Sequence, residues 1–219
     1  SVGKAAAGIV DGGETTNKVE LFQTQFTTEL SFWERLLRVN ADYTYRRTSG
    51  NYNSYRTKYL IGYGPDDVRE EGDNAATRSG LFDHYKVFNI YGTLNKDIGK
   101  HSLTAILGFN QESFRREEFG VTRTGLISSS FPTIELATGD ATGTELIETY
   151  ALRGAFYRLN YIYDNRYIIE FNGRYDGSSR FPKDKRFGFF PSGSAAWRVD
   201  QEQFMESVRG TVSNLKLRA

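Results

Sequence analysis

Residues 37–46 read LRVNADYTYR, and this stretch decides the fold class because apolar and polar side chains alternate along it without exception. The apolar positions are Leu37, Val39, Ala41, Tyr43 and Tyr45, and the polar positions between them include Arg38 and Asp42. A period of two places successive side chains on opposite faces of an extended chain. The stretch therefore predicts a β-strand with one apolar and one polar face.

The same alternation recurs along the chain and predicts an all-β protein. It is clear over residues 103–110, 155–163 and 167–176, and it is weaker over 22–30, 88–94, 191–197 and 215–217. The polar face of these segments carries formal charges in mid-strand, among them Asp42, Arg158, Glu170 and Arg174. Together the segments predict about eight strands, the last of them short.

The links between these strands alternate in length. Short links are expected at residues 31–34, 96–100 and 164–166, and long polar links at 47–83, 116–148 and 177–187, with a helical turn at 200–205. Short connections on one rim and long ones on the other are typical of an antiparallel up-and-down membrane barrel. The spacing therefore favours an up-and-down sheet with two different rims.

The direction in which the two faces point separates a membrane barrel from a soluble β-sandwich. In a barrel the apolar face meets lipid and the polar face lines the lumen, whereas in a sandwich the apolar faces of two sheets pack on each other. Tyrosines at the strand ends suit a membrane interface and favour the barrel. On that interpretation Arg38, Asp42, Arg158, Glu170, Arg174 and Asp176 face the lumen and have structural roles. A soluble β-sandwich that binds carbohydrate stays open as the alternative.

Composition argues against several other classes. No run of about 20 apolar residues exists, so helical membrane spans are excluded. The net charge of +1 gives no field that would favour nucleic acid as a partner, and the absence of Cys rules out disulfides and thiolate metal sites. With His84 and His101 as the only histidines, and an acidic run at 66–73 that lacks the spacing of a calcium loop, we expect no enzyme, cofactor or metal site.

Several motifs in order make residues 157–218 resemble the SusC/RagA family of TonB-linked outer-membrane transporters of Bacteroidetes. These motifs are YRLNY at 157–161, DNRY at 164–167, RYDGSSRF at 174–181, FFPS at 189–192 with AAWR at 195–198, and LKLRA at 215–219. The resemblance implies a barrel of about 22 strands in the bacterial outer membrane. Residues 1–219 would be about eight strands of that barrel domain, without its plug domain.

The resemblance also implies a function. Family members import large nutrients, glycan oligosaccharides or peptides, beneath a SusD-like surface lipoprotein, and the TonB complex drives uptake without chemistry on the substrate. In that setting the protein contacts membrane lipid, and its long links face outward. Aromatic and charged residues there are candidates for contact with substrate or lipoprotein, namely Tyr52, Tyr55, Arg78, Phe119, Arg180 and Phe181.

The RYDGSSRF segment is expected to close a strand end rather than to bind substrate. Asp176 is expected to pair with Arg180 or Arg198, and the hydroxyls of Ser178 and Ser179 to bond back to the main chain.

Overall fold

The computed structural model describes residues 12–208, 210–212 and 214–219. Within them lie the strands β1 (Gly13–Phe32), β2 (Leu37–Arg56), β3 (Tyr59–Gly62), β4 (Val68–Glu71), β5 (Ala75–Ile98), β6 (His101–Thr124), β7 (Ala141–Tyr163), β8 (Tyr167–Ser178), β9 (Phe187–Arg198) and β10 (Lys216–Arg218). Three short 3₁₀ helices are η1 (Lys183–Lys185), η2 (Val199–Gln201) and η3 (Gln203–Val208). No helix in this part of the chain is long and apolar enough to cross a membrane.

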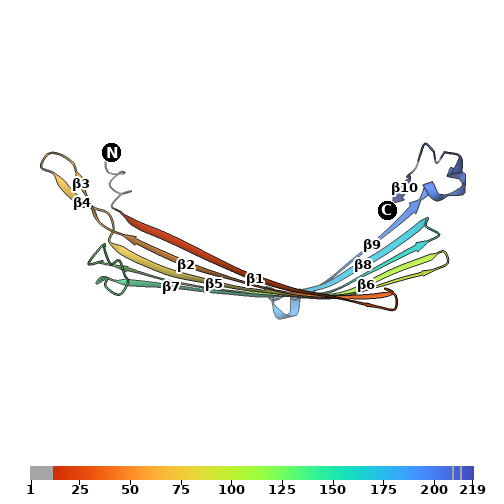
Figure 1. Ribbon diagram of the computed structural model, residues 1–219, viewed down its shortest axis with the longest axis horizontal. Helices are drawn as coiled ribbons and strands as arrows, with labels where there is room; N and C mark the ends of the chain where they lie inside the picture. The colour runs from red at the N-terminus through yellow and green to blue at the C-terminus, as the bar shows by residue number, and fades with distance from the viewer. Residues whose placement is uncertain (1–11, 209, 213) are drawn as a thin grey trace. The chain divides into compact units, whose positions relative to one another are not determined.

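Eight of these strands form one sheet in the order β1-β2-β5-β6-β7-β8-β9-β10, while β3 and β4 form a separate hairpin (Figure 1). Each strand of the large sheet pairs with the next one along the chain, apart from the inserted hairpin, and the pairing is antiparallel wherever the register is defined. The predicted all-β, up-and-down architecture is confirmed. The described strands do not divide into two facing sheets, so the β-sandwich alternative is wrong.

The tight hairpins follow from residues that accept a left-handed backbone. Asp164 and Asn165 join β7 to β8 with φ of 50° and 55°, and the Arg166 N–H donates to the Tyr163 carbonyl at 2.9 Å. Asp and Asn tolerate this conformation, and a two-residue turn of this kind matches the twist of paired strands. Gly99, with φ of 57°, turns β5 into β6. The short links predicted near these positions are confirmed.

Several strands are longer than their apolar pattern predicts. β2 continues to Arg56, and β5 and β6 are 24 residues each, so the long links shrink to 57–74, 125–140 and 179–186. The ladder continues because main-chain hydrogen bonds between strands do not depend on apolar side chains. The expectation that Tyr52, Tyr55, Arg78 and Phe119 lie in links is therefore wrong, since these residues belong to β2, β5 and β6.

The described chain comprises two compact units. The first contains residues 12–23, 46–84 and 114–149 and has a small core of Ala76, Leu126 and Ala137, with Tyr55 and Ile134 packed against it. The second contains residues 24–45, 85–113 and 150–219 and includes β8, β9 and β10.

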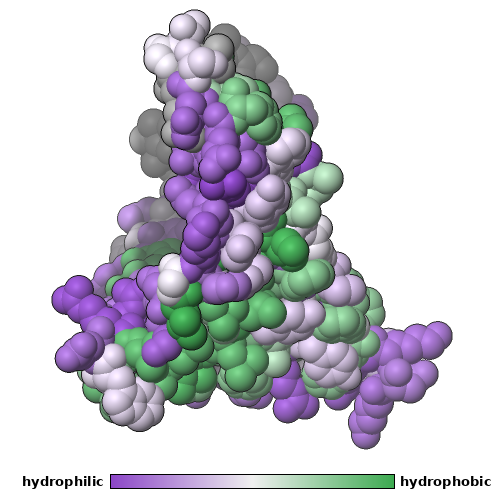
Figure 2. Space-filling model, turned by 90° about the vertical axis from the view of Figure 1, so that its right-hand side faces the viewer, coloured by the Kyte–Doolittle hydropathy of each residue, from purple (hydrophilic) through white to green (hydrophobic). Residues whose placement is uncertain are grey.

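In the second unit the strand register places apolar side chains together on one face of the sheet and polar side chains together on the other. Tyr175 lies opposite Ala155 on β7 and Phe189 on β9, while on the other face Glu170 lies opposite Asn160 and Ser194. Figure 2 shows hydrophobic side chains gathered in the lower half of the view, with hydrophilic ones at its lower corners and up the middle of its upper half. Phe171, Tyr175 and Phe189 are among the exposed apolar residues. An apolar surface of this kind is suited to lipid.

The Glu202 carboxylate binds three side chains where β8 begins and β9 ends, and we refer to this group as the Glu202 hub. Glu202, between η2 and η3, accepts hydrogen bonds from Trp197 Nε1 at 2.9 Å, the Tyr167 hydroxyl at 2.8 Å and Arg166 Nη1 at 3.1 Å. The Trp197 bond, followed by those of Tyr167 and Arg166, holds the pKa of the Glu202 carboxyl below its usual value of 4.5. The charged form of Glu202 is therefore the one that the folded chain prefers.

Two glycines on the apolar face should respond differently to replacement by alanine. Gly173 is buried beneath the Tyr157 ring, which an added methyl group would overlap, whereas a methyl group on Gly193 would lie 3.4 Å from the Phe171 ring. We expect Gly173→Ala to lower the free energy of unfolding of the full-length protein by about 1 kcal/mol, the low end for overpacking, because the partly exposed Tyr157 ring has to move aside. Gly193→Ala should change it little. Urea titration followed by heat-modifiable gel mobility measures both, and equal effects would contradict the packing.

The Glu202 hub predicts a dependence on pH. Because its folded pKa is depressed, its contribution to stability is present above 4.5 and is lost as pH falls through the lower folded value. When the pH is lowered from 5 to about 3, the urea concentration at the unfolding midpoint should decrease more in the wild type than in Glu202→Gln. The same slope in both proteins would show that the carboxylate does not hold this strand end.

Candidate functional site

The polar face of β7 and β8 carries a connected network of side chains. Arg158 Nη2 donates to Glu170 Oε1 at 3.3 Å, and Arg158 Nε donates to Asn172 Oδ1 at 3.1 Å. Glu170 also accepts bonds from Asn160 Nδ2 at 3.2 Å and from Asn172 Nδ2 at 2.9 Å. The register explains the network, because Arg158 lies opposite Asn172 and Asn160 lies opposite Glu170. Each polar group is therefore matched by a neighbour across the strands.

A bidentate ion pair extends the polar face along β8. Arg174 donates from Nε and Nη2 to the two carboxylate oxygens of Asp176 at 2.9 Å each, and from Nη2 to Asn110 Oδ1 at 3.4 Å. Its guanidinium carbon lies 5.5 Å from the centre of the Phe156 ring. Gly154 faces Asp176 across the strands, and an added Cβ would overlap the carboxylate. The pair thus depends on the absence of a side chain at Gly154.

The predicted pairing of Asp176 with Arg180 or Arg198 is wrong. Arg174 is two residues from Asp176 on the same face of the strand, so it reaches the carboxylate without the loop. Arg198 instead donates to Asn165 Oδ1 at 2.7 Å and lies 3.8 Å from Asp200.

The structure brings together four of the six residues expected to line a lumen, Arg158, Glu170, Arg174 and Asp176. The other two lie on β2, where Arg38 and Asp42 share one face and Asp42 Oδ2 accepts a bond from Asn89 Nδ2 on β5 at 2.7 Å. Charged groups are thus distributed over several strands of the polar face.

The loop of residues 179–186 stands off the sheet between β8 and β9, and we refer to it as the β8–β9 loop. Ser179 N–H donates to the Ala151 carbonyl at 2.9 Å, and Ala151 N–H donates to Ser179 Oγ at 2.8 Å. Arg180 N–H donates to Ser178 Oγ at 3.3 Å, and Arg186 Nε donates to the Phe181 carbonyl at 3.0 Å. These bonds confirm that both serines bond back to the main chain, and they fix the loop against β7.

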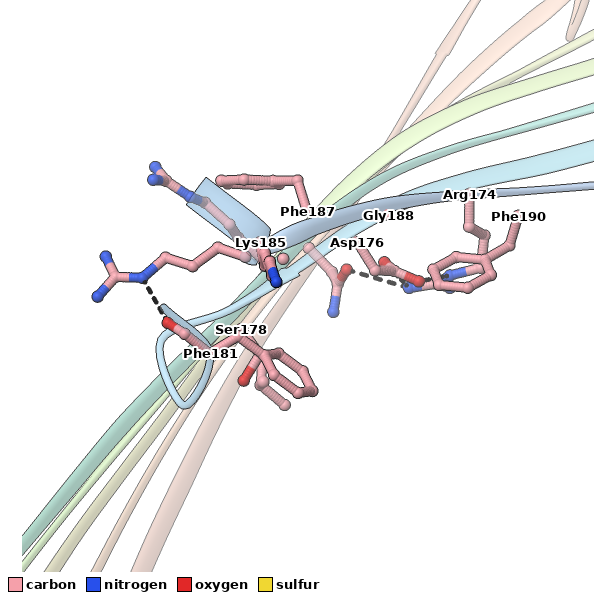
Figure 3. Close-up of a pocket in the computed structure, with 13 residues that line it drawn as sticks. Arg174, Asp176, Ser178, Phe181, Lys185, Phe187, Gly188 and Phe190 are labelled. Carbon is pink, nitrogen blue, oxygen red and sulfur yellow. Dashed lines mark hydrogen bonds and ion pairs between the residues drawn. The ribbon is translucent and has the colours of Figure 1, made fainter. Parts of the chain in front are cut away.

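A cavity of about 420 Å³ lies between the β8–β9 loop and the polar face. Figure 3 shows the Arg174–Asp176 pair and Phe190 on its strand side, with Phe181 and Lys185 contributed by the loop. Sequence reasoning identified Phe181 but missed Asn110, Lys185 and Phe190. The basic composition of residues 183–186 was the available signal for Lys185, whereas Asn110 and Phe190 come close only through the pairing of distant strands.

The candidate contact residues of the β8–β9 loop are accessible. Phe181 is 58% exposed and lines the cavity, and the Arg180 guanidinium carbon lies 4.6 Å from the centre of the Tyr150 ring. Contact of these residues with substrate or lipoprotein stays a prediction.

Three candidates in the first unit make contacts within that unit, and their contact with substrate or lipoprotein stays a prediction. Arg78 donates to the carbonyls of Thr77 and Pro132 at 3.0 Å each. Tyr55 packs on the small core, and the Phe119 ring stacks with that of Phe82 at 6.2 Å between centres. These contacts hold the links and strands of the first unit together.

Tyr52 is the fourth candidate in the first unit, and it lines a separate cavity of about 290 Å³ together with Glu118. A tyrosine and a carboxylate could bind a polar solute there, so substrate contact by Tyr52 also stays a prediction.

Three carboxylates of the acidic run at 66–73 form ion pairs. Asp67 pairs with Arg69 at 2.8 Å, Glu70 with Lys58 at 2.9 Å, and Asp73 with Arg56 at 2.9 Å. The described residues contain no cluster of three or more His, Asp or Glu side chains arranged to hold a metal ion.

Comparison with known proteins identifies the family. Residues 5–215 match the family described as "TonB dependent receptor-like, beta-barrel". TonB-dependent receptor P26 of Formosa agariphila is 36% identical over 180 residues, which are 76% of this chain and 17% of that protein. TonB-dependent receptor SusC of Bacteroides thetaiotaomicron is 35% identical over 156 residues, or 67% of this chain and 15% of that protein. The chain thus spans less than a fifth of these relatives.

Solved structures show the same fold. The RagAB peptide importer in its "open-open" state superposes with a TM-score of 0.80 at 20% identity, covering 96% of this chain and 22% of that one. The RagAB peptide transporter gives a TM-score of 0.78 at 19% identity over 90% of this chain. The open eight-stranded sheet corresponds to part of a barrel wall. The chain belongs to the TonB-dependent receptor β-barrel family of the bacterial outer membrane, a family of transporters rather than enzymes, and its resemblance to SusC/RagA is confirmed.

Proposed function

We propose that this chain forms part of the wall of an outer-membrane importer of large nutrients, oligosaccharides or peptides, which works with a SusD-like lipoprotein and draws energy through TonB. The observation that carries the proposal is the strand register of β7, β8 and β9, which separates an apolar face from a connected polar face. Membership of the TonB-dependent receptor family supplies the class of activity.

The two faces suit the two environments of a membrane barrel. The apolar face would contact lipid, which cannot hydrogen-bond to the main chain, and the antiparallel pairing satisfies the main-chain groups internally. The polar face, with Arg158, Glu170, Arg174 and Asp176, would line a hydrated lumen, and Arg38 and Asp42 would extend it. Because these charges are largely matched within the wall, a polar solute would not be trapped by one sign of charge.

We assign residues 1–219 to the barrel domain and place the plug and the TonB-contacting segment elsewhere in the whole protein. The much greater length of the relatives supports this assignment. Tyr52, Arg180 and Phe181 remain the best candidates for contact with substrate or lipoprotein, because Tyr52 and Phe181 line cavities and Arg180 belongs to the β8–β9 loop.

Deleting the gene from its native bacterium tests import. We expect the deletion strain to lose growth on one class within a panel of oligosaccharides and peptides, and the full-length gene to restore it. A fluorescent derivative of that nutrient should accumulate in wild-type cells. A protonophore should abolish accumulation but not surface binding, because uptake needs the energy that TonB delivers. Growth and accumulation that do not change on deletion would contradict the proposal.

A further inference from the structure

The β8–β9 loop over the cavity is held in place by its own hydrogen bonds. The loop is anchored to β7 by the paired bonds between Ser179 and Ala151, and it is closed internally by the bond from Arg186 Nε to the Phe181 carbonyl. The Lys185 N–H donates to the Pro182 carbonyl at 2.9 Å, which fixes the 3₁₀ turn that carries Lys185. A ligand that enters this cavity would not need to order the loop, so less of its binding energy would be lost.

The charge of the cavity is positive. Three basic residues of its lining, Arg174, Lys185 and Arg186, are set against the single carboxylate of Asp176, while the side chain of Arg153 lies on the apolar face against the Phe187 ring. Asp176 is held by both oxygens in its pair with Arg174, so its charge is already matched. Lys185 has no ion-pair partner among the residues that the structure describes. The lining therefore offers a cation to a ligand and little repulsion to an anion.

Aromatic rings complete the lining. Phe181 and Phe190 are 58% and 62% exposed at the cavity, and Figure 3 shows Phe181 on the loop side and Phe190 on the strand side. Exposed rings of this kind pack against the apolar faces of sugar rings. Ser178 and Asn110 supply neutral hydrogen-bonding groups suited to hydroxyls.

The main chain at this site is occupied, which disfavours an extended peptide. Each of residues 167–177 of β8 pairs with β7 on one side and with β9 on the other. Recognition of a peptide by strand addition needs unpaired main-chain groups. The recognising groups left at the cavity are cationic, hydroxyl, carboxamide and aromatic side chains.

We propose that this cavity is a subsite for an acidic sugar unit, bearing a carboxylate or a sulfate ester, of an oligosaccharide that the importer takes up. Lys185 binds the acidic group, and Phe181 and Phe190 pack on the sugar ring. This inference rests on the proposed import function and names the substrate class for one of its sites.

Two lysines in one 3₁₀ turn provide a matched test. Lys185 lines the cavity, whereas Lys183, two residues away in η1, does not. The full-length receptor, purified from native outer membranes with its bound partners, is applied to an array of uronate-containing, sulfated and neutral oligosaccharides and acidic peptides. We expect retention of acidic oligosaccharides that weakens with added salt. Lys185→Gln should weaken it about fivefold, the upper range for an exposed ion pair, and Lys183→Gln should leave it unchanged.

Retention of neutral oligosaccharides only, of acidic peptides only, or of nothing would overturn the subsite, as would equal effects of the two lysine substitutions. Uptake separates this failure from a failure of import. If cells with Lys185→Gln import the nutrient on which the deletion strain cannot grow, and do so at the wild-type rate, the import function stands and the subsite is wrong. If the wild-type gene restores no uptake to the deletion strain, import itself is wrong.

Discussion

Main-chain hydrogen bonding between neighbouring strands is the constraint on which the rest of this structure depends. A strand in a bilayer must pair its N–H and C=O groups with other strands, because lipid offers no partner. The pairing also fixes the face of every side chain, since a slip of one residue exchanges the two faces. In β8 such a slip would place Glu170 where Ile169 now lies. The strand register therefore determines the lipid surface and the polar network together.

The polar network shows how charged groups can line a wall at little cost. Arg158 with Glu170 and Arg174 with Asp176 are matched within β7 and β8, and amide side chains supply further bonds. The two arginine side chains are 53% and 50% exposed, so each pair stabilises the wall only modestly. Against this matched background, Lys185 on the β8–β9 loop stands out as a cation available to a ligand. Selectivity for the substrate would then come from the β8–β9 loop, and the shape of the barrel wall from the strands.

Local residue patterns predicted the two-faced strands and the tight turns, because alternation and residues such as Asp164, Asn165 and Gly99 act over short distances. They did not predict how far β2, β5 and β6 continue, because main-chain pairing persists where apolar alternation has stopped. They also missed the partner of Asp176, for which Arg180 or Arg198 was expected in place of Arg174. The roles of Asn110, Phe190 and Glu202 could not be predicted from local patterns. Asn110 and Phe190 come to the cavity through strand pairing, and Glu202 lies in a turn that has no periodicity.

The central claim is that the apolar face meets lipid and the polar face meets water, and spin labels at adjacent residues of β8 test it most directly. Because this chain contains no Cys, single cysteines at Phe171 and Asn172 can be labelled in a cysteine-free full-length receptor reconstituted in bilayers. The account predicts that the label at 171 is relaxed mainly by oxygen, which partitions into lipid. The label at 172 should be relaxed mainly by a water-soluble nickel chelate. Preferential relaxation of both labels by the nickel chelate, or the reverse assignment of the two faces, would contradict it.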